Sequence, residues 1–341
     1  MTLTAPPQAD AQRITDAVAA RKPRRRGIGA LAFVGYLVVV AEIVVFSLAS
    51  PIFATPDNLF TVLVQAAVPA IAGFGLAVVI ITGGDDVIRG GIDLSSGPLV
   101  GLAGVVAALA LAAGTGAPVA ILLALLVTLG FGAVNGLTVV LGVRPLLATL
   151  ASGGIVASVV FLTTNNVKIP VDDPLFVALR DGAVLGIPAP VVVLALVAVL
   201  AGLAVSRSPW GVRSYAVGQN PTAARVAGVP VWRYIAGSYV VSGLFAGVAG
   251  VLLAARLAAA VPGIGSQILL DIIITAYLSV VFSRRFVVTI GGTLLAAVFV
   301  AALGNGFTLL GVGSQWVGAI KGILILLVLA LAAVREKGVR R

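Results

Sequence analysis

The chain is a series of long, uninterrupted apolar runs separated by short polar segments. The runs do not alternate with a period of two, as the strands of a membrane barrel would. Most of them approach the roughly 20 residues that a helix needs to cross a bilayer core. We therefore predict an all-α, polytopic membrane protein with about ten transmembrane helices. The predicted spans are residues 28–50, 59–82, 97–113, 117–141, 145–163, 189–206, 235–258, 267–283, 286–303 and 314–334.

The composition supports this fold class. Of the 341 residues, 60% are hydrophobic and only 10% are charged, whereas soluble domains carry about 25% charged residues. The polar segments are too short to hold a soluble catalytic domain. The two longest internal ones are an outer segment at 164–188 and an inner segment at 207–234.

The formal net charge of +10 does not indicate nucleic-acid binding, because the basic residues follow the predicted topology. With the N-terminal tail inside, only Lys168 and Arg180 of the 22 Lys and Arg residues fall in outer loops. This asymmetry is the positive-inside rule of membrane proteins, and it predicts that both termini are cytoplasmic. The resulting divisions are a cytoplasmic tail at 1–27, a transmembrane domain at 28–334 and a cytoplasmic tail at 335–341.

Several chemistries are excluded by residues that the chain lacks. It contains no Cys and no His, which excludes disulfides, Cys or His nucleophiles and His/Cys zinc sites. No Gly-x-x-x-x-Gly-Lys-Ser/Thr run is present, so the chain has no Walker A loop to hold ATP. No catalytic cluster is visible. We expect no enzymatic activity, no metal site and no cofactor.

The inner segment at 207–234 carries the signature of a short, capped helix. Asn220 is a strong N-cap residue, Pro221 suits the first helical position, and Gly228 ends a helix. The pattern predicts about two turns of helix over 222–227. A helix this short is weak alone, so it makes sense when it packs into a groove of a partner. The alternative is a capped surface turn that rests on lipid headgroups.

A second polar element interrupts the apolar pattern at 90–97, which reads Gly-Gly-Ile-Asp-Leu-Ser-Ser-Gly. Paired glycines break a helix, and nearby Asp and Ser side chains can bond the backbone groups that the break frees. Non-helical backbone at membrane depth is tolerated only when it is buried in protein or lines a cavity. The element therefore either lines or gates a transport path or caps the third span; for Asp93 we favour an N-terminal cap. The candidate residues are Gly90, Gly91, Asp93, Ser95 and Ser96.

Both motifs resemble those of the ribose-type permease family of ABC importers. The cytoplasmic loop of that family carries Gly-x-Asn-Pro-x-Ala-Ala-Arg-x-x-Gly, and its signature Gly-Gly-Ile-Asp-Leu-Ser is similar to residues 90–95. The resemblance covers 58–334 and implies that the loop seats a coupling helix on an ATPase. The matching loop residues are Gly218, Asn220, Pro221, Ala223, Ala224, Arg225 and Gly228.

Two segments depart from the family pattern. Residues 82–89 read Thr-Gly-Gly-Asp-Asp-Val-Ile-Arg, as though the glycine pair were duplicated with a charged insert. Residues 278–286 read Leu-Ser-Val-Val-Phe-Ser-Arg-Arg-Phe, where the family usually has a Gly-Gly-x-Ser-x-x-Gly-Gly loop. These departures bear on the substrate and on gating rather than on the fold.

Four ionisable residues fall inside predicted spans: Glu42, Arg256, Asp271 and Lys321. Such residues usually face protein or water and pair with one another. We predict that Asp271 pairs with Arg256 or with Lys321 near an outer gate. The alternative is that these side chains extend to the membrane surface.

Together these features predict the permease subunit of an ABC importer in the cytoplasmic (inner) membrane, moving a ribose-like monosaccharide. The resemblance implies four partners: a separate cytoplasmic ATPase, an extracytoplasmic solute-binding protein, a second permease copy or homologue, and membrane lipid. Two alternatives remain. One is a permease for another small polar solute, such as a nucleoside or a branched-chain amino acid. The other is a secondary transporter driven by an ion gradient.

Overall fold

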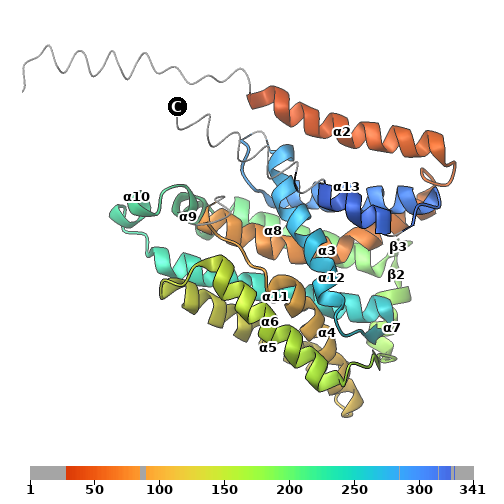
Figure 1. Ribbon diagram of the computed structural model, residues 1–341, viewed down its shortest axis with the longest axis horizontal. Helices are drawn as coiled ribbons and strands as arrows, with labels where there is room; N and C mark the ends of the chain where they lie inside the picture. Colours follow the sequence, from red (N-terminus) through yellow and green to blue (C-terminus); the bar gives the residue numbers. More distant parts are fainter. Residues whose placement is uncertain (1–27, 85–89, 284, 314, 324–325, 327–341) are drawn as a thin grey trace, which may run out of the picture.

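The computed structural model describes the chain except residues 1–27, 85–89, 284, 314, 324–325 and 327–341, and it shows a helical bundle (Figure 1). The predicted tails and the charged insert at 85–89 lie outside the described residues. The helices are α2 (Ile28–Ala49), α3 (Pro56–Gly83), α4 (Ser96–Ala112), α5 (Ala117–Val140), α6 (Pro145–Thr164), α7 (Pro174–Asp181), α8 (Ala189–Ser206), α9 (Pro209–Gln219), α10 (Pro221–Val226), α11 (Val231–Leu257), α12 (Ile264–Leu278), the 3₁₀ turn η1 (Ser279–Phe282) and α13 (Ile290–Leu309).

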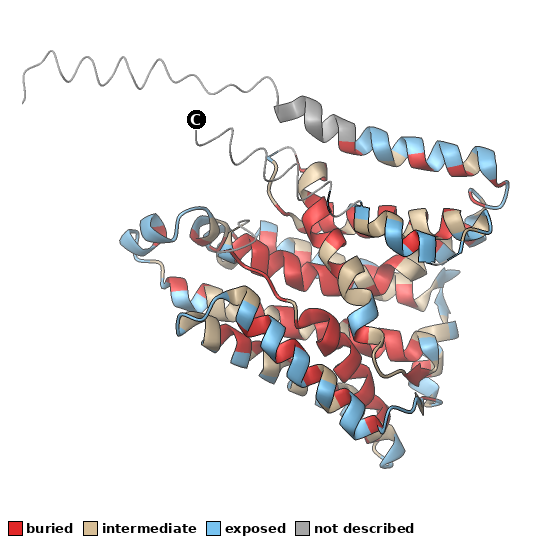
Figure 2. Cartoon of the chain, in the orientation of Figure 1, coloured by how far each residue is buried: buried red, intermediate tan, exposed pale blue. Residues whose placement is uncertain are grey.

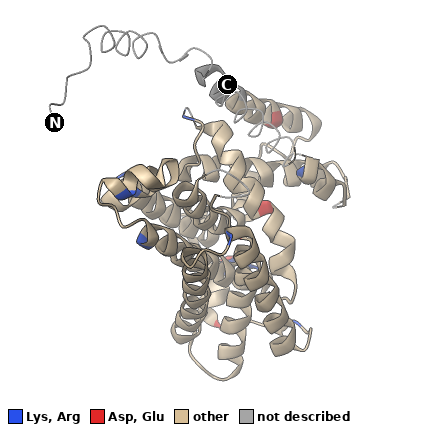
Figure 3. Cartoon of the chain, turned by 60° about the vertical axis from the view of Figure 1, so that its left-hand side comes forward, with Lys and Arg blue, Asp and Glu red and all other residues tan. Residues whose placement is uncertain are grey.

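Seven of the described helices are long and apolar enough to cross a membrane: α3, α5, α6, α8, α11, α12 with η1, and α13. Two shorter apolar helices accompany them, α4 and the described part of α2. The predicted tenth span is described only in part and is helical over 315–323. Charged positions are few along these helices (Figure 3). The protein is therefore an all-α, multi-pass membrane protein.

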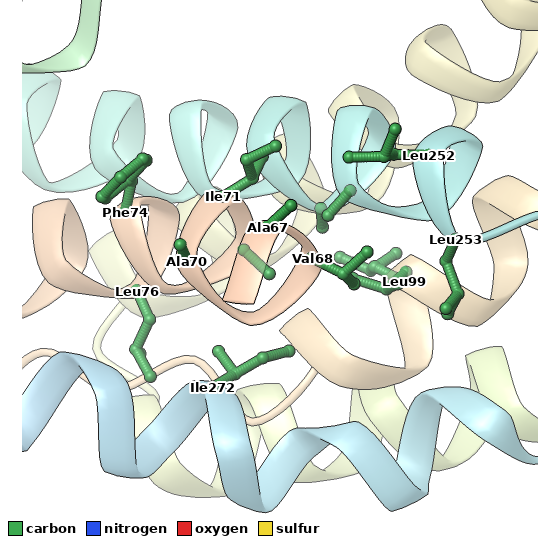
Figure 4. Close-up of a cluster of buried hydrophobic side chains, with 14 of the residues drawn as sticks. Ala67, Val68, Ala70, Ile71, Phe74, Leu76, Leu99, Leu252, Leu253 and Ile272 are labelled. Carbon is green, nitrogen blue, oxygen red and sulfur yellow. The ribbon is translucent and has the colours of Figure 1, made fainter. Parts of the chain in front are cut away.

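The bundle is built around α3. Nearly every residue of α3 from Ala66 to Thr82 is buried, and it packs against α11, α13, α12 and α8. Figure 4 shows α3 lying along α11, with Leu253 of α11 near Val68 of α3 and Leu99 of α4. The buried residues concentrate on these inner helices, whereas α2, α5 and α6 expose long apolar faces (Figure 2). Exposed leucine and valine are stable on such faces when the surrounding medium is lipid.

Four strands of two residues each form two small antiparallel pairs. They are β1 (Ile169–Pro170) with β4 (Ala259–Ala260), and β2 (Ala183–Val184) with β3 (Ile187–Pro188). Together with α7 they fold the segment 164–188 over one end of the bundle. The sequence analysis left this segment without secondary structure, because its elements are too short to show a periodic pattern.

Several predicted boundaries differ from the structure. The seventh span was placed at 235–258, but α11 begins at Val231, and the eighth was placed at 267–283, but α12 runs from Ile264 to Leu278. The ninth span was placed at 286–303, but α13 runs from Ile290 to Leu309. Thr289 sets this start, because its hydroxyl accepts a hydrogen bond from the Gly292 amide at 3.0 Å. The inner segment at 207–234 was expected to hold one short helix, but it also contains α9, whose start is capped by Ser208. Hydrophobicity alone does not reveal either cap.

Candidate functional site

The segment from α9 to α10 protrudes from one end of the bundle (Figure 1). The short helix α10 begins where the sequence predicts, because the Asn220 side chain accepts a hydrogen bond from the Ala223 amide at 2.9 Å. It ends at Val226, and Gly228 follows with a positive φ of 79°. The capping residues thus define a rigid two-turn helix.

The helix α10 is almost entirely exposed. Ala224 is its single buried residue, and it packs on a small apolar cluster with Val217, Val231 and Tyr234. The opposite face presents Arg225, and the Val226 side chain is 86% exposed. This surface of small, apolar and basic side chains is open to a partner.

Behind α10, the helix α9 is held against the core at two points. A side chain at Gly218 would collide with the carbonyl oxygen of Ile81 near the end of α3, so glycine is required for this close approach. The Tyr215 hydroxyl donates a hydrogen bond to the Val288 carbonyl at 2.9 Å, just before α13. Burial raises the pKa of Tyr215 to about 12. The helix α9 therefore connects α10 to the end of α3 and to the segment just before α13.

The glycine-rich element packs against the same end of α3. A Cβ at Gly91 would collide with the carbonyl oxygen of Val79, and the Gly91 amide donates to the Gly84 carbonyl at 3.2 Å. Only a residue without a side chain allows this contact. Gly90 and Gly91 are both buried, so the non-helical backbone lies inside protein.

Asp93 is fully buried at the centre of a hydrogen-bonded cluster. Its Oδ1 atom accepts from the Ser95 amide at 3.0 Å and from the Ser95 hydroxyl at 2.6 Å. Its Oδ2 atom accepts from the Ser242 hydroxyl of α11 at 2.7 Å. The Ser96 hydroxyl donates to the Asp93 carbonyl at 2.9 Å. The N-cap residue of α4 is Ser95, not Asp93. Asp93 positions Ser95 through the hydrogen bonds from the Ser95 amide and hydroxyl.

The cluster extends to two further helices. Asn135 of α5 donates to the Ser95 hydroxyl at 2.8 Å, and the Leu94 amide donates to the Thr149 hydroxyl of α6 at 3.1 Å. Tyr239 of α11 donates to the Ile92 carbonyl at 3.2 Å. One short segment thus ties α4, α5, α6 and α11 together. We call Asp93, Ser95, Asn135 and Ser242 the buried polar cluster.

The ionisable residues predicted inside the spans lie toward the opposite end of the bundle. Asp271 of α12 forms an ion pair with Lys321, with an Nζ–Oδ1 distance of 2.9 Å and an Nζ–Oδ2 distance of 3.0 Å. Of the two pairings left open by the sequence, this is the one present. Arg256 lines the same pocket but forms no ion pair within the described part of the chain. Both oxygens of Glu42 lack a hydrogen-bond partner among the described residues.

The structure therefore separates the candidate residues into three places: the exposed α10, the buried polar cluster and the pocket of Arg256, Asp271 and Lys321. Asn135, Thr149 and Ser242, which complete the bonds around Asp93 and Ser95, were not predicted, although each is a polar residue inside a predicted apolar span. A reciprocal amide pair was not predicted either: Asn58 and Asn305 donate to each other at 2.9 and 3.0 Å. Both lie just outside the predicted spans, so the apolar pattern did not single them out.

Comparisons with known proteins identify the family of the chain. The family described as "Branched-chain amino acid transport system / permease component" matches residues 58–329. The chain belongs to this permease family. It is therefore a membrane permease subunit of an ABC importer, in a family of transport proteins rather than enzymes.

Individual relatives cover most of the chain. The ribose import permease protein of Bacillus subtilis (strain 168) is 32% identical over 308 residues, which is 88% of this chain and 91% of the relative. That of Escherichia coli (strain K12) is 34% identical over 296 residues, or 85% and 90%. The D-allose transport system permease protein of Escherichia coli (strain K12) is 29% identical over 304 residues, or 87% and 90%. No solved structure matches the chain.

Proposed function

We propose that this permease forms the translocation path for a monosaccharide and that α10 is the surface on which a separate ATPase acts. The substrate class is supported by the relatives, which are named for ribose and D-allose. The coupling role rests mainly on one observation: α10 is capped, protrudes from the bundle and exposes every residue except Ala224.

The proposed topology has ten transmembrane helices with both termini in the cytoplasm. The proposed domains are those of the sequence analysis, a cytoplasmic tail at 1–27, a transmembrane domain at 28–334 with a coupling loop at 207–234, and a cytoplasmic tail at 335–341. The charge of the coupling loop supports this orientation, since basic loops face the cytoplasm. Its basic residues are Arg207, Arg213, Arg225 and Arg233.

The coupling residues Gly218, Asn220 and Gly228 have distinct roles in this proposal. Asn220 and Gly228 fix the two ends of α10, while Gly218 lets α9 touch α3. ATP binding would bring the ATPase subunits together and displace α10. The contacts of Gly218 with Ile81 and of Tyr215 with Val288 would transmit that displacement to α3 and α13. The bundle would then alternate between outward-open and inward-open states.

The proposed role of the buried polar cluster is positioning rather than substrate contact. Asp93 and Ser95 have no exposed surface, and all the polar atoms of the Asp93 carboxylate are bonded. The cluster would keep α4, α5, α6 and α11 together as one unit while the rest of the bundle moves. The proposed partners are an ATPase at α10, a solute-binding protein at the opposite end, a second permease copy or homologue, and lipid.

Charge introduced on α10 tests the coupling role. Val226→Asp places a carboxylate on the exposed face of α10, and we expect the ATPase no longer to co-purify with the permease. Leu185→Asp is the matched control, because Leu185 is 99% exposed near the opposite end of the bundle. Retention of the ATPase by the Val226 variant would contradict the proposal.

A transport assay separates the proposal from its alternatives. We expect uptake of a monosaccharide into proteoliposomes to require the ATPase and ATP and to be blocked by vanadate. Uptake driven by a proton or sodium gradient with this chain alone would favour a secondary transporter. Uptake of leucine or a nucleoside instead of a sugar would leave the coupling role intact and change the substrate.

A further inference from the structure

A pocket lies toward the end of the bundle opposite α10. Its volume is about 200 Å³, well above the roughly 10–15 Å³ that a single water needs and below the roughly 300–1,000 Å³ of drug-sized sites. Its walls come from α3, α11, α12, α13 and the helical residues 315–323. The size suits one small solute.

The pocket combines an ion pair, an unpaired cation and an amide. Asp271 and Lys321 are bound to each other, with side chains 22% and 18% exposed. Arg256 faces the same space, and within the described residues no acid pairs with it. Gln65 adds a side-chain amide. Uncompensated charge inside a membrane protein is costly, so the Arg256 guanidinium requires water or a ligand oxygen.

Pro69 lies one helical turn after Gln65, and both residues line the pocket. Proline has no N–H, so Pro69 cannot donate to the carbonyl oxygen of Gln65 four residues earlier. Freed carbonyls in membrane helices are tolerated where another group bonds them. The lining also has an apolar part, which includes Ile268 and Val300.

We infer that this pocket is a binding site for one uncharged, polyhydroxylated solute on its way through the permease. Hydroxyl groups both donate and accept, so they can donate to the Asp271 carboxylate or the Gln65 carbonyl and accept from Arg256. The apolar wall contacts the C–H face of the same molecule. The inference rests on the proposed function and assigns the substrate to a place within the membrane domain.

Other ligand classes match less well. An acyl chain would leave Arg256 without a partner in a dry site. An amino acid would bring an ammonium group beside Arg256 and Lys321, while the one acidic side chain in the pocket is already bound through both oxygens. Like charges this close repel. A neutral polyol satisfies the cation and adds no charge.

Binding of radiolabelled D-ribose and D-allose to the purified full-length permease tests the inference. Arg256→Gln removes the cation and is expected to raise Kd about 10- to 100-fold, the range for losing one hydrogen bond to a charged group. Gln65→Leu keeps the side-chain volume and is expected to raise Kd about tenfold. Arg144→Gln is the matched control, since Arg144 is exposed at the start of α6, far from the pocket. Its Kd is expected to equal that of the wild type.

The outcomes separate this inference from the proposed function. If the intact transporter carries one of these sugars but neither variant changes Kd or the KM for uptake, the pocket is not the binding site and the proposed function stands. If it carries no pentose or hexose, the proposed substrate class is wrong and the inference falls with it, while the proposed coupling role of α10 is unaffected. If leucine or the carboxylate D-ribonate displaces the bound sugar at lower concentration than the sugar itself, the pocket binds a charged solute. Equal monodispersity on gel filtration verifies that each variant is folded.

Discussion

The buried polar cluster allows a quantitative prediction. Asp93→Ala removes the acceptor of three hydrogen bonds, those from the Ser95 amide, the Ser95 hydroxyl and the Ser242 hydroxyl. A buried donor that loses its partner costs about 1–3 kcal/mol. Three donors at about 1–2 kcal/mol each give a loss of about 3–6 kcal/mol in the free energy of unfolding. Ser242→Ala removes one bond to a carboxylate and is expected to cost about 1.5–3 kcal/mol.

The two substitutions should not be additive. Once Asp93 is alanine, the Ser242 hydroxyl is a buried donor without its acceptor, so its removal should recover part of the loss. The coupling energy of the double-mutant cycle should therefore be at least about 1.5–3 kcal/mol, whereas independent sites add within about 0.5 kcal/mol. The measurement is the shift of the unfolding midpoint in mixed micelles titrated with a denaturing detergent.

Ser158→Ala is the control for this cycle. Ser158 is a helix serine in α6 whose hydroxyl donates to the Gly154 carbonyl at 3.0 Å on the exposed surface. Its removal should cost less than about 0.5 kcal/mol, as do most surface substitutions. An additive cycle, or a Ser242→Ala cost as small as that of the control, would refute the view that Asp93 ties α11 to the start of α4.

Three further outcomes are expected. Asn58→Leu should destabilise the permease by about 1–3 kcal/mol because it leaves Asn305 buried without its partner, and adding Asn305→Leu should recover part of the loss in the same detergent titration. Gly218→Ala should abolish ATP-driven uptake while the ATPase still co-purifies. The reason is that the added Cβ disturbs the contact of α9 with α3 but leaves α10 unchanged. Normal uptake by this variant would contradict the role of Gly218 in coupling. Burial raises the pKa of Tyr215 to about 12, so its hydroxyl stays neutral below that pH. Tyr215→Phe should therefore change the rate of uptake without changing the pH profile of uptake between pH 6 and 9.

Sequence patterns predicted the membrane class and the position of most spans, because long apolar runs leave few other choices in lipid. The start of α10 was also predicted, since Asn220 and Pro221 act on their immediate neighbours. The start of α13 was wrong by four residues, because residues 286–289 are apolar enough to join the span while Thr289 caps the helix at Ile290. The helix α9 was missed because it is neither apolar nor periodic.

The sequence did not show which residues far apart in the chain bond to each other. The bond between Asp93 and Ser242 joins positions 149 residues apart, and no local pattern selects Ser242 over other serines in the spans. The pairing of Asp271 was predicted as one of two choices, and only packing decided for Lys321. The residue types at a membrane site are readable from sequence, whereas the choice of partner depends on how helices are arranged.

The amide pair of Asn58 and Asn305 has a consequence for biosynthesis. The two residues are 247 positions apart, and chain elongation at about 5–20 residues per second separates their emergence by about 12–50 s. During that interval the Asn58 side-chain amide has its nearby partner, the Phe53 carbonyl at 2.9 Å, but not Asn305. Insertion of α3 thus precedes its final anchoring, which is completed only after α13 has been synthesised.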